Sequence, residues 1–227
     1  GFGAVSALFA LLIRVTEQHE ENDESENKPF YIYAVQGFKI LFQTPSVLVL
    51  MAAIMTLALI YLPTEMLILP TAYNEMGDPE GLGLVVSAMA FASVFGALFF
   101  EQIHKRISYA NILRIGILGV PLSMIPMSQL PAQWAMIFFG MILGLVWGPL
   151  LPLLNTVIQT KIPANKRGRV FSLEMTVWSA GPMISMVAVG AAVDAIGVKP
   201  IYLALSLGVL VAGILVSTNK YIKELDS

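Results

Sequence analysis

One acidic side chain lies inside an otherwise apolar segment of this 227-residue chain. Glu65 occurs in the stretch YLPTEMLILP, close to Pro63. A carboxylate within a bilayer is costly unless it faces a cavity, finds a partner or takes up a proton. We therefore identify Glu65 as a candidate for proton coupling or for binding a cationic substrate. The alternative is a structural role, in which Glu65 reaches the outer interface or hydrogen-bonds a neighbour such as Thr64.

A second acid, Glu174, follows a group of four cations, Lys161, Lys166, Arg167 and Arg169. We expect the cations to occupy a loop and Glu174 to lie about one turn inside the apolar segment that follows. An acid at that place is favoured by the helix dipole and can pair with Arg169. The alternative is a role in a cytoplasmic gate.

Other chemistry has few residues to use. The chain has no cysteine, which excludes disulfides and thiol nucleophiles, and its two histidines, His19 and His104, are far apart. We find no phosphate-binding loop, no Ser/His/Asp arrangement and no HExxH motif. The sequence therefore predicts a protein that is not an enzyme and that holds no metal or cofactor. A net charge of −2 gives no sign of a nucleic-acid partner.

The composition is that of a membrane protein. Hydrophobic residues make up 57% of the chain and charged residues 12%, against about 25% charged in soluble domains. Six apolar segments are each close to the length of about 20 residues that spans a bilayer. They cover residues 47–72, 82–100, 110–127, 134–154, 170–193 and 200–218. The predicted fold is an all-α six-helix transmembrane bundle within residues 46–218.

The remaining segments receive simpler interpretations. Residues 1–13 are apolar but too short to span a bilayer, so we interpret them as the end of a truncated transmembrane helix. Residues 14–45 begin with an acidic linker, which has six acids between Glu17 and Glu26. The segment Pro29–Leu41 follows and is either an amphipathic helix on the membrane surface or an irregular lead-in. Residues 219–227 are expected to be a tail.

The basic residues predict an orientation. If the acidic linker is cytoplasmic, Lys199 is the one external cation of 13, which leaves 13 − 1 = 12 on the cytoplasmic side. Lys and Arg accumulate on that side of membrane proteins. We therefore expect a multi-pass protein of the cell membrane with its linker and C-terminus in the cytoplasm.

Large adaptable side chains in the predicted spans could line a cavity. The candidates are Trp147, Trp178, Met175 and Phe91. Met and aromatic surfaces repack around varied ligands, although ordinary helix packing is the more common role of such side chains. Packing is the preferred interpretation for Gly140, Gly144 and Gly148, which are spaced four residues apart.

The basic group also carries a family resemblance. Pro163, followed by Arg167, Gly168, Arg169 and Val170, resembles the Pro-x-x-x-Arg-Gly-Arg-Val motif between helices 10 and 11 of major facilitator superfamily transporters. The likeness is greatest to the drug and macrolide efflux and enterobactin-exporter branch.

Two weaker likenesses support it. Residues 97–106, ALFFEQIHKR, resemble a degraded copy of the superfamily's Gly-x-Leu-Ala-Asp-Arg-x-Gly-Arg-Lys loop. The resemblance implies that Glu101, Lys105 and Arg106 form a cytoplasmic gate with Arg167 and Arg169, whereas a solvated loop is the alternative. Gly181-Pro182 resembles a family helix kink, and Pro63 is a second expected kink.

The resemblance covers essentially the whole chain and implies the C-terminal half of a twelve-helix transporter that works by alternating access. Its partners would be the N-terminal half, the lipid bilayer, a hydrophobic small molecule and protons, exchanged by antiport. A siderophore or lysolipid exporter of the same architecture is an alternative. A non-transporting membrane module is another.

Overall fold

The computed structural model describes residues 30–226, with side chains from residue 36 onward. The predicted end of a helix at residues 1–13 and the acidic linker lie outside the described residues. Within residues 30–226 all the regular structure is helical. A short helix α2 (Phe30–Gln43) precedes the bundle, so the amphipathic segment is a helix and not an irregular lead-in.

Within the described part of the chain, six stretches are long and apolar enough to cross a membrane, which confirms the predicted six-helix architecture. Three are single α-helices at α5 (Pro79–Leu98), α7 (Tyr109–Met127) and α11 (Val198–Ser217), and a fourth is the 33-residue α10 (Ala164–Ile196). The other two are composite. One comprises α3 (Pro45–Pro63), η1 (Thr64–Ile68) and α4 (Leu69–Met76). The other comprises α8 (Gln133–Trp147) and α9 (Leu150–Lys161).

Local chemistry sets several helix ends. Asp78 accepts a hydrogen bond from the Gly81 amide at 2.9 Å and so caps α5, while the Ser108 hydroxyl accepts from the Asn111 amide at the start of α7. Such caps satisfy backbone donors that a helix N-terminus leaves free. Gly77 ends α4 at φ 70°, a conformation in which glycine has no steric penalty.

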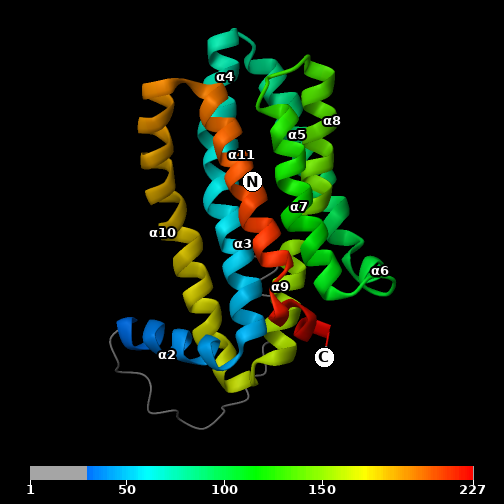
Figure 1. The fold of residues 1–227 in the computed structure, drawn as a ribbon, viewed down its shortest axis with the longest axis vertical. Helices are drawn as coiled ribbons and strands as arrows, with labels where there is room; N and C mark the ends of the chain where they lie inside the picture. The colour runs from blue at the N-terminus through cyan, green and yellow to red at the C-terminus, as the bar shows by residue number, and fades with distance from the viewer. Residues whose placement is uncertain (1–29, 227) are drawn as a thin grey trace, which may run out of the picture.

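The central helix is α3, with α10 and α11 beside it and α5, α7 and α8 on its other side (Figure 1). Its residues are apolar all round, as expected for a helix enclosed by others. Leu50, Ile54 and Leu57 are among the buried side chains of α3. The outer helix α10 is much less enclosed and leaves a long apolar surface open.

The predicted glycine face packs as expected. A Cβ atom at Gly144 would collide with the carbonyl oxygen of Met89, and one at Gly148 would collide with that of Ser93. The two backbones of α5 and α8 therefore approach closely, as small residues permit in membrane bundles.

The start of α10 corrects the predicted loop. The helix begins at Ala164, directly after Pro163, so Lys166, Arg167 and Arg169 belong to its first turns. The Arg167 Nε atom donates to the Ile162 carbonyl at 2.8 Å and closes the turn before the helix. A basic, glycine-containing run indicated a loop, but Lys and Arg are good helix formers and Pro163 is a suitable residue to precede a first turn.

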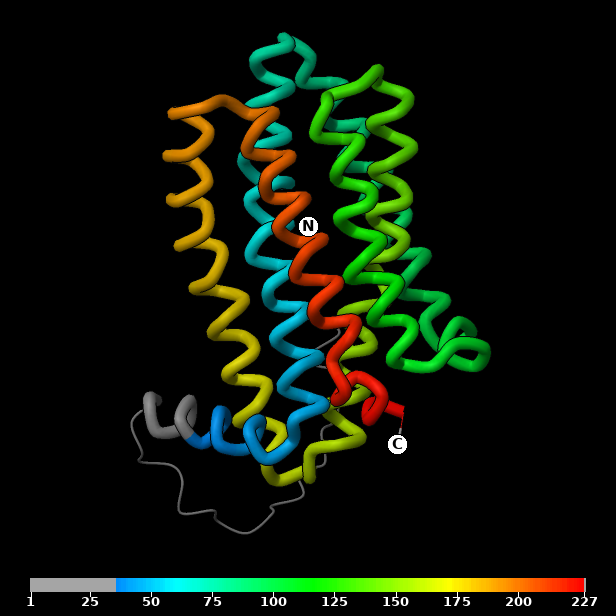
Figure 2. The backbone as a smooth tube through the Cα atoms, viewed as in Figure 1, coloured from blue at the N-terminus to red at the C-terminus, as the bar shows by residue number. Residues whose placement is uncertain are grey.

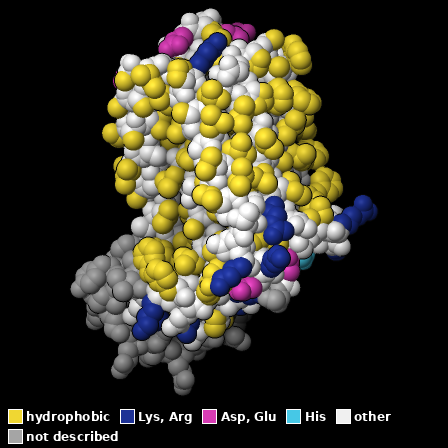
Figure 3. Space-filling view, viewed as in Figure 1, with side chains coloured by type: hydrophobic (Ala, Val, Ile, Leu, Met, Phe, Trp, Pro, Cys, Tyr) yellow, Lys and Arg dark blue, Asp and Glu magenta, His cyan; other side chains and the backbone are white. Residues whose placement is uncertain are grey.

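The two ends of the bundle differ in charge. The end with α6 (Phe100–His104) and the start of α10 carries most of the described Lys and Arg residues, and we call it the basic end. The opposite end carries Glu75, Asp78, Glu80, Asp194 and Lys199, and we call it the acidic end. Figure 3 shows hydrophobic side chains between these two ends over the face that carries α7 and α11.

Both peripheral elements pack at the basic end. Helix α2 lies across the start of α10, where Gly37 permits a close approach to the Arg169 carbonyl, and it exposes Phe38 and Phe42 (Figure 2). The expected tail contains the 3-10 helix η2 (Lys220–Asp226), which buries Ile222 and Leu225 against the bundle.

The α5–α8 contact predicts the effect of a single methyl group. Gly144→Ala should lower the stability of the purified protein by about 1–3 kcal/mol, because the added atom overpacks a tight helix contact. Gly83→Ala on α5 is the control, since a Cβ there meets nothing within 4 Å. Thermal unfolding in detergent measures both, and equal unfolding temperatures for the two variants would contradict the close packing.

Candidate functional site

The acid most enclosed by the bundle is Glu174, which is 3% exposed. Because α10 begins at Ala164, Glu174 is ten residues beyond the helix start, which is about 15 Å at 1.5 Å per residue. The expected position one turn inside a helix is therefore wrong, and the dipole of the N-terminus is far away. Within the described residues no cation pairs with Glu174, and the expected ion pair with Arg169 is absent.

The polar group that approaches Glu174 is the indole of Trp178, one turn further along α10. The Trp178 Nε1 atom is buried and interacts with the Glu174 carboxylate, but it does not close a hydrogen bond of ordinary geometry. A buried indole N–H that lacks a full partner is unusual, since such groups are nearly always bonded. The pair is therefore an incompletely satisfied polar site within the bundle.

Aromatic rings continue from Trp178 across the bundle. Trp178 packs edge-on against Trp147 at the end of α8, with 6.4 Å between ring centroids. Trp147 in turn stacks on Tyr61 of α3 at 4.6 Å and 27°. We call Tyr61, Trp147 and Trp178 the aromatic chain. Two of the four predicted cavity residues, Trp147 and Trp178, thus come together from different helices.

Glu65, the first acid identified in the sequence, lies at the other end of the aromatic chain from Glu174. Glu65 is half-buried, and its carboxylate interacts with the hydroxyl of Tyr61, four residues earlier. It lies in η1, a π-helical turn that directly follows Pro63. Such turns occur frequently at functional sites. The Thr64 hydroxyl donates to the Ile60 carbonyl at 3.0 Å, so it does not form the bond to Glu65 that was considered as an alternative.

A third buried polar group lies near these residues. Tyr202 of α11 is completely buried, and its hydroxyl has no hydrogen-bond partner among the described residues. Tyr202 is within electrostatic range of Tyr61. Neither tyrosine was among the site residues predicted from the sequence. The spacing of Tyr61 and Glu65, four residues apart on one helix face, was the signal that could have found the first.

The outer face of α10 next to the aromatic chain is hollowed and partly polar. Its lining residues are Phe171, Ser172, Met175, Thr176, Ser179 and Ala180. Met175 is 65% exposed there. Pro182 lies further along the same helix, which changes direction near its middle (Figure 2). A proline removes one backbone hydrogen bond and is a common cause of such a bend.

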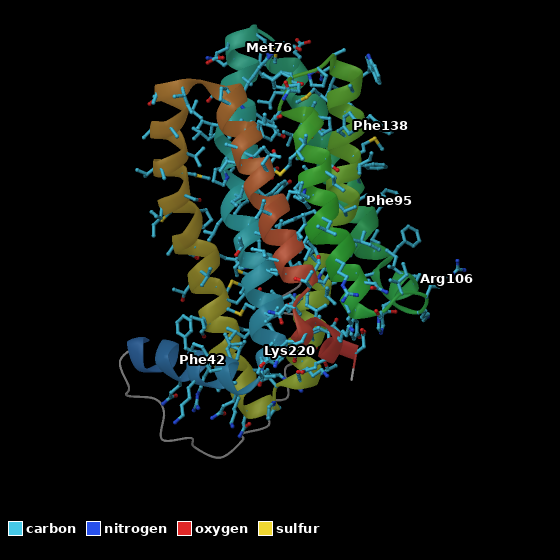
Figure 4. All side chains as sticks on the ribbon, in the orientation of Figure 1. Phe42, Met76, Phe95, Arg106, Phe138 and Lys220 are labelled. Atoms are coloured by element: carbon cyan, nitrogen blue, oxygen red, sulfur yellow. The ribbon has the colours of Figure 1, made fainter. Side chains whose placement is uncertain are left out.

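The remaining predicted residues lie elsewhere. Phe91 packs against Phe95 at 4.7 Å in a separate apolar hollow between α5 and α8. Glu101, Lys105 and Arg106 are exposed at α6 and form no ion pair within the described residues. Figure 4 shows Arg106 pointing outward on the side of the bundle opposite α10. Arg167 and Arg169 therefore do not join the α6 charges in one cluster.

His104 in α6 is partly buried. Its ring stacks on Tyr109 at 3.7 Å with a 2° interplanar angle, and its Nδ1 atom is buried. The packing of His104 on Tyr109 thus fixes the α6 turn. In the superfamily loop that residues 97–106 resemble, the position of His104 is a glycine. No group of three or more metal-ligating side chains occurs among residues 30–226.

The six long apolar spans found within residues 30–226 make this a multi-span membrane protein. The sequence matches the Major Facilitator Superfamily over residues 1–185 and 66–223, and the chain belongs to this family. It is 28% identical to the multidrug efflux pump Tap of Mycolicibacterium fortuitum over 85% of this chain and 47% of that protein. Tap of Mycobacterium tuberculosis strain H37Rv is 29% identical over 76% of this chain and 41% of its own length.

A more distant relative is the multidrug resistance protein MdtG of Serratia proteamaculans, which is 28% identical over 63% of this chain and 34% of its own length. The chain thus spans less than half the length of the curated relatives it matches. These findings confirm the family predicted from the basic motif and its likeness to drug-efflux members.

The proximity of Trp178 and Glu174 predicts a spectroscopic signal. With Trp134 and Trp147 replaced by phenylalanine, Trp178 is the single tryptophan of the chain. Its emission should change with pH as the neighbouring carboxyl group gains or loses its charge, and Glu174→Gln should remove that change. Glu101→Gln is the control, because Glu101 is exposed at the α6 turn. An unchanged pH dependence of the Trp178 emission in the Glu174→Gln protein would contradict the contact between Trp178 and Glu174.

Proposed function

We propose that the protein exports hydrophobic, positively charged small molecules in exchange for protons, and that Glu174 is the carboxylate at which the two compete. The observation that carries this proposal is the burial of Glu174 without a cationic partner beside Trp178. Ionisable residues inside membrane spans that lack a partner commonly mark substrate or proton pathways.

The aromatic chain suits the same substrate class. Tryptophan faces attract organic cations, and a desolvated site strengthens that attraction to about 2 kcal/mol. A protonated Glu174 is neutral and offers no charge to such a cation, whereas the ionised form does. Binding of a proton and binding of the drug therefore exclude each other at one group, which is the requirement for exchange.

Glu65 takes a supporting role in this proposal. The sequence analysis predicted the coupling role for Glu65, but Glu65 is more exposed than Glu174 and already interacts with the Tyr61 hydroxyl. The π-helical turn after Pro63 gives its segment an irregular backbone, and broken helices are typical of transport paths. We propose that Glu65 relays protons between the acidic end and the aromatic chain.

A complete pathway needs a second helical unit. The curated relatives are more than twice as long as the portion that this chain matches. The hollow beside Met175 and Ser179 lies on the open face of α10, where a facing half would complete a cavity. We propose that the partner is the N-terminal half of the same transporter, and that the two halves alternate in opening the cavity to each side of the membrane.

Efflux measurements with carboxylate variants test the main proposal. In the whole transporter, Glu174→Gln should reduce proton-driven efflux of a cationic dye to the background of cells without the transporter, because the amide can neither ionise nor release a proton. Glu65→Gln should slow efflux without abolishing it. Asp194→Asn is the control, since Asp194 is exposed at the acidic end.

Normal efflux by a well-expressed Glu174→Gln protein would overturn the assignment of the carboxylate. An undiminished rate after the proton gradient is collapsed would overturn proton exchange itself. Efflux of an uncharged or anionic compound in preference to the cation would favour the siderophore or lysolipid alternatives.

We also propose that the basic end faces the cytoplasm, since Lys and Arg accumulate on that side. These 227 residues contain no cysteine, so labelling of a cysteine introduced among them can be compared with the background of the unmodified transporter. Lys199→Cys should react with a membrane-impermeant maleimide in intact cells, whereas Arg106→Cys should react only after permeabilisation. The reverse labelling pattern would contradict the orientation.

A further inference from the structure

An apolar groove of about 250 Å³ runs between α3, α7 and α11. Small residues form much of it, including Ala52 and Ala53 on α3 and Ala212 and Gly213 on α11. Apolar cavities of about 150 Å³ already bind benzene. The groove therefore has room for a segment of a hydrocarbon chain.

The groove offers a ligand few polar groups along its length. The Thr56 hydroxyl donates to the Ala52 carbonyl at 2.8 Å, so its proton is already used within α3. The other polar lining residue is Asn219, where α11 has ended at the basic end. The groove is thus apolar along the bundle and polar at one end.

Two cations lie at that polar end. Arg114 is one turn before the lining residue Ile117 on α7, and Lys220 directly follows Asn219. The Arg114 Nε atom donates to the Ser217 carbonyl at 3.4 Å, and Nη1 donates to Asn111 Oδ1 at 3.0 Å. Because arginine has five N–H donors, three remain for a ligand.

The local acids leave these cations unneutralised. The Asp226 carboxylate accepts hydrogen bonds from the Tyr109 and Ala110 amides at 2.7 and 3.4 Å, which caps α7. Neither Arg114 nor Lys220 forms an ion pair within residues 30–226. The Lys220 Nζ atom instead lies 4.9 Å from the Tyr221 ring centroid, near the end of α11 in Figure 4.

We propose that this groove binds an acyl chain of an anionic phospholipid, with the lipid phosphate held by Arg114 and Lys220. The surface around it suits a lipid, because Ile115, Leu122, Val211 and Leu215 are exposed apolar side chains of α7 and α11. The two cations complement a phosphate and repel a cationic drug. This site is separate from Glu174 and does not depend on the proposed transport cycle.

Lipid binding to the purified, delipidated whole protein tests the proposal. Native mass spectrometry should show preferential binding of phosphatidylglycerol over phosphatidylcholine with matched acyl chains. Lys220→Gln should reduce that preference about fivefold, in line with the usual contribution of one cation at a lipid surface. Lys199→Gln, at the opposite end of α11, is the control and should leave it unchanged.

A variant in the groove tests lipid binding without changing Arg114, which also bonds the Ser217 carbonyl. Ala212→Leu fills the groove and should weaken binding of both lipids while the cations remain. Equal binding of the two lipids to the unmodified protein would overturn the proposal, as would full preference in the Lys220→Gln protein. Displacement of phosphatidylglycerol by equimolar glycerol 3-phosphate would also overturn it, because it would show a phosphate site that does not use the groove.

Discussion

Hydrocarbon offers no hydrogen bonds, so every polar group within the bundle depends on a partner from the protein. Most of the hydroxyl groups obey this constraint within their own helix. Thr64, Ser123 and Ser206 each donate to the carbonyl four residues earlier, at 2.7–3.0 Å. The exceptions are therefore informative. Glu174, the Trp178 Nε1 atom and the Tyr202 hydroxyl are enclosed without ordinary partners, and the aromatic chain lies among them.

This arrangement links packing to function. The aromatic chain joins α3, α8 and α10 through ring contacts, so a change in the charge of Glu174 would act directly on the contact between outer and central helices. Helix α10 is the least enclosed of the spans within the described residues, and its open side is the one that the proposed facing half would cover. In the proposed exchange, a proton or a cation that binds at Glu174 would change the contacts of the helix that borders the open face of the bundle.

The spans were predictable because the length and hydropathy of a span can be read from one uninterrupted segment of the sequence. The start of α10 was not, because charge and glycine content suggested a loop although the same residues are compatible with a helix. That error moved the expected depth of Glu174 and led to an ion pair that the structure lacks. The contacts of Trp147 with Tyr61 and Trp178 join residues 86 and 31 positions apart, since 147 − 61 = 86 and 178 − 147 = 31. Helix periodicity carries no information about such distant pairs.

The central claim is that Glu174 exchanges a proton for a cationic substrate, and proton release on substrate binding tests it most directly. Adding a cationic dye to the purified whole transporter in weakly buffered detergent solution should release protons, detected with a pH indicator. The Glu174→Gln protein should release almost none, while the Asp194→Asn protein should match the unmodified one. Undiminished release from a folded Glu174→Gln protein that still binds the dye would contradict the account.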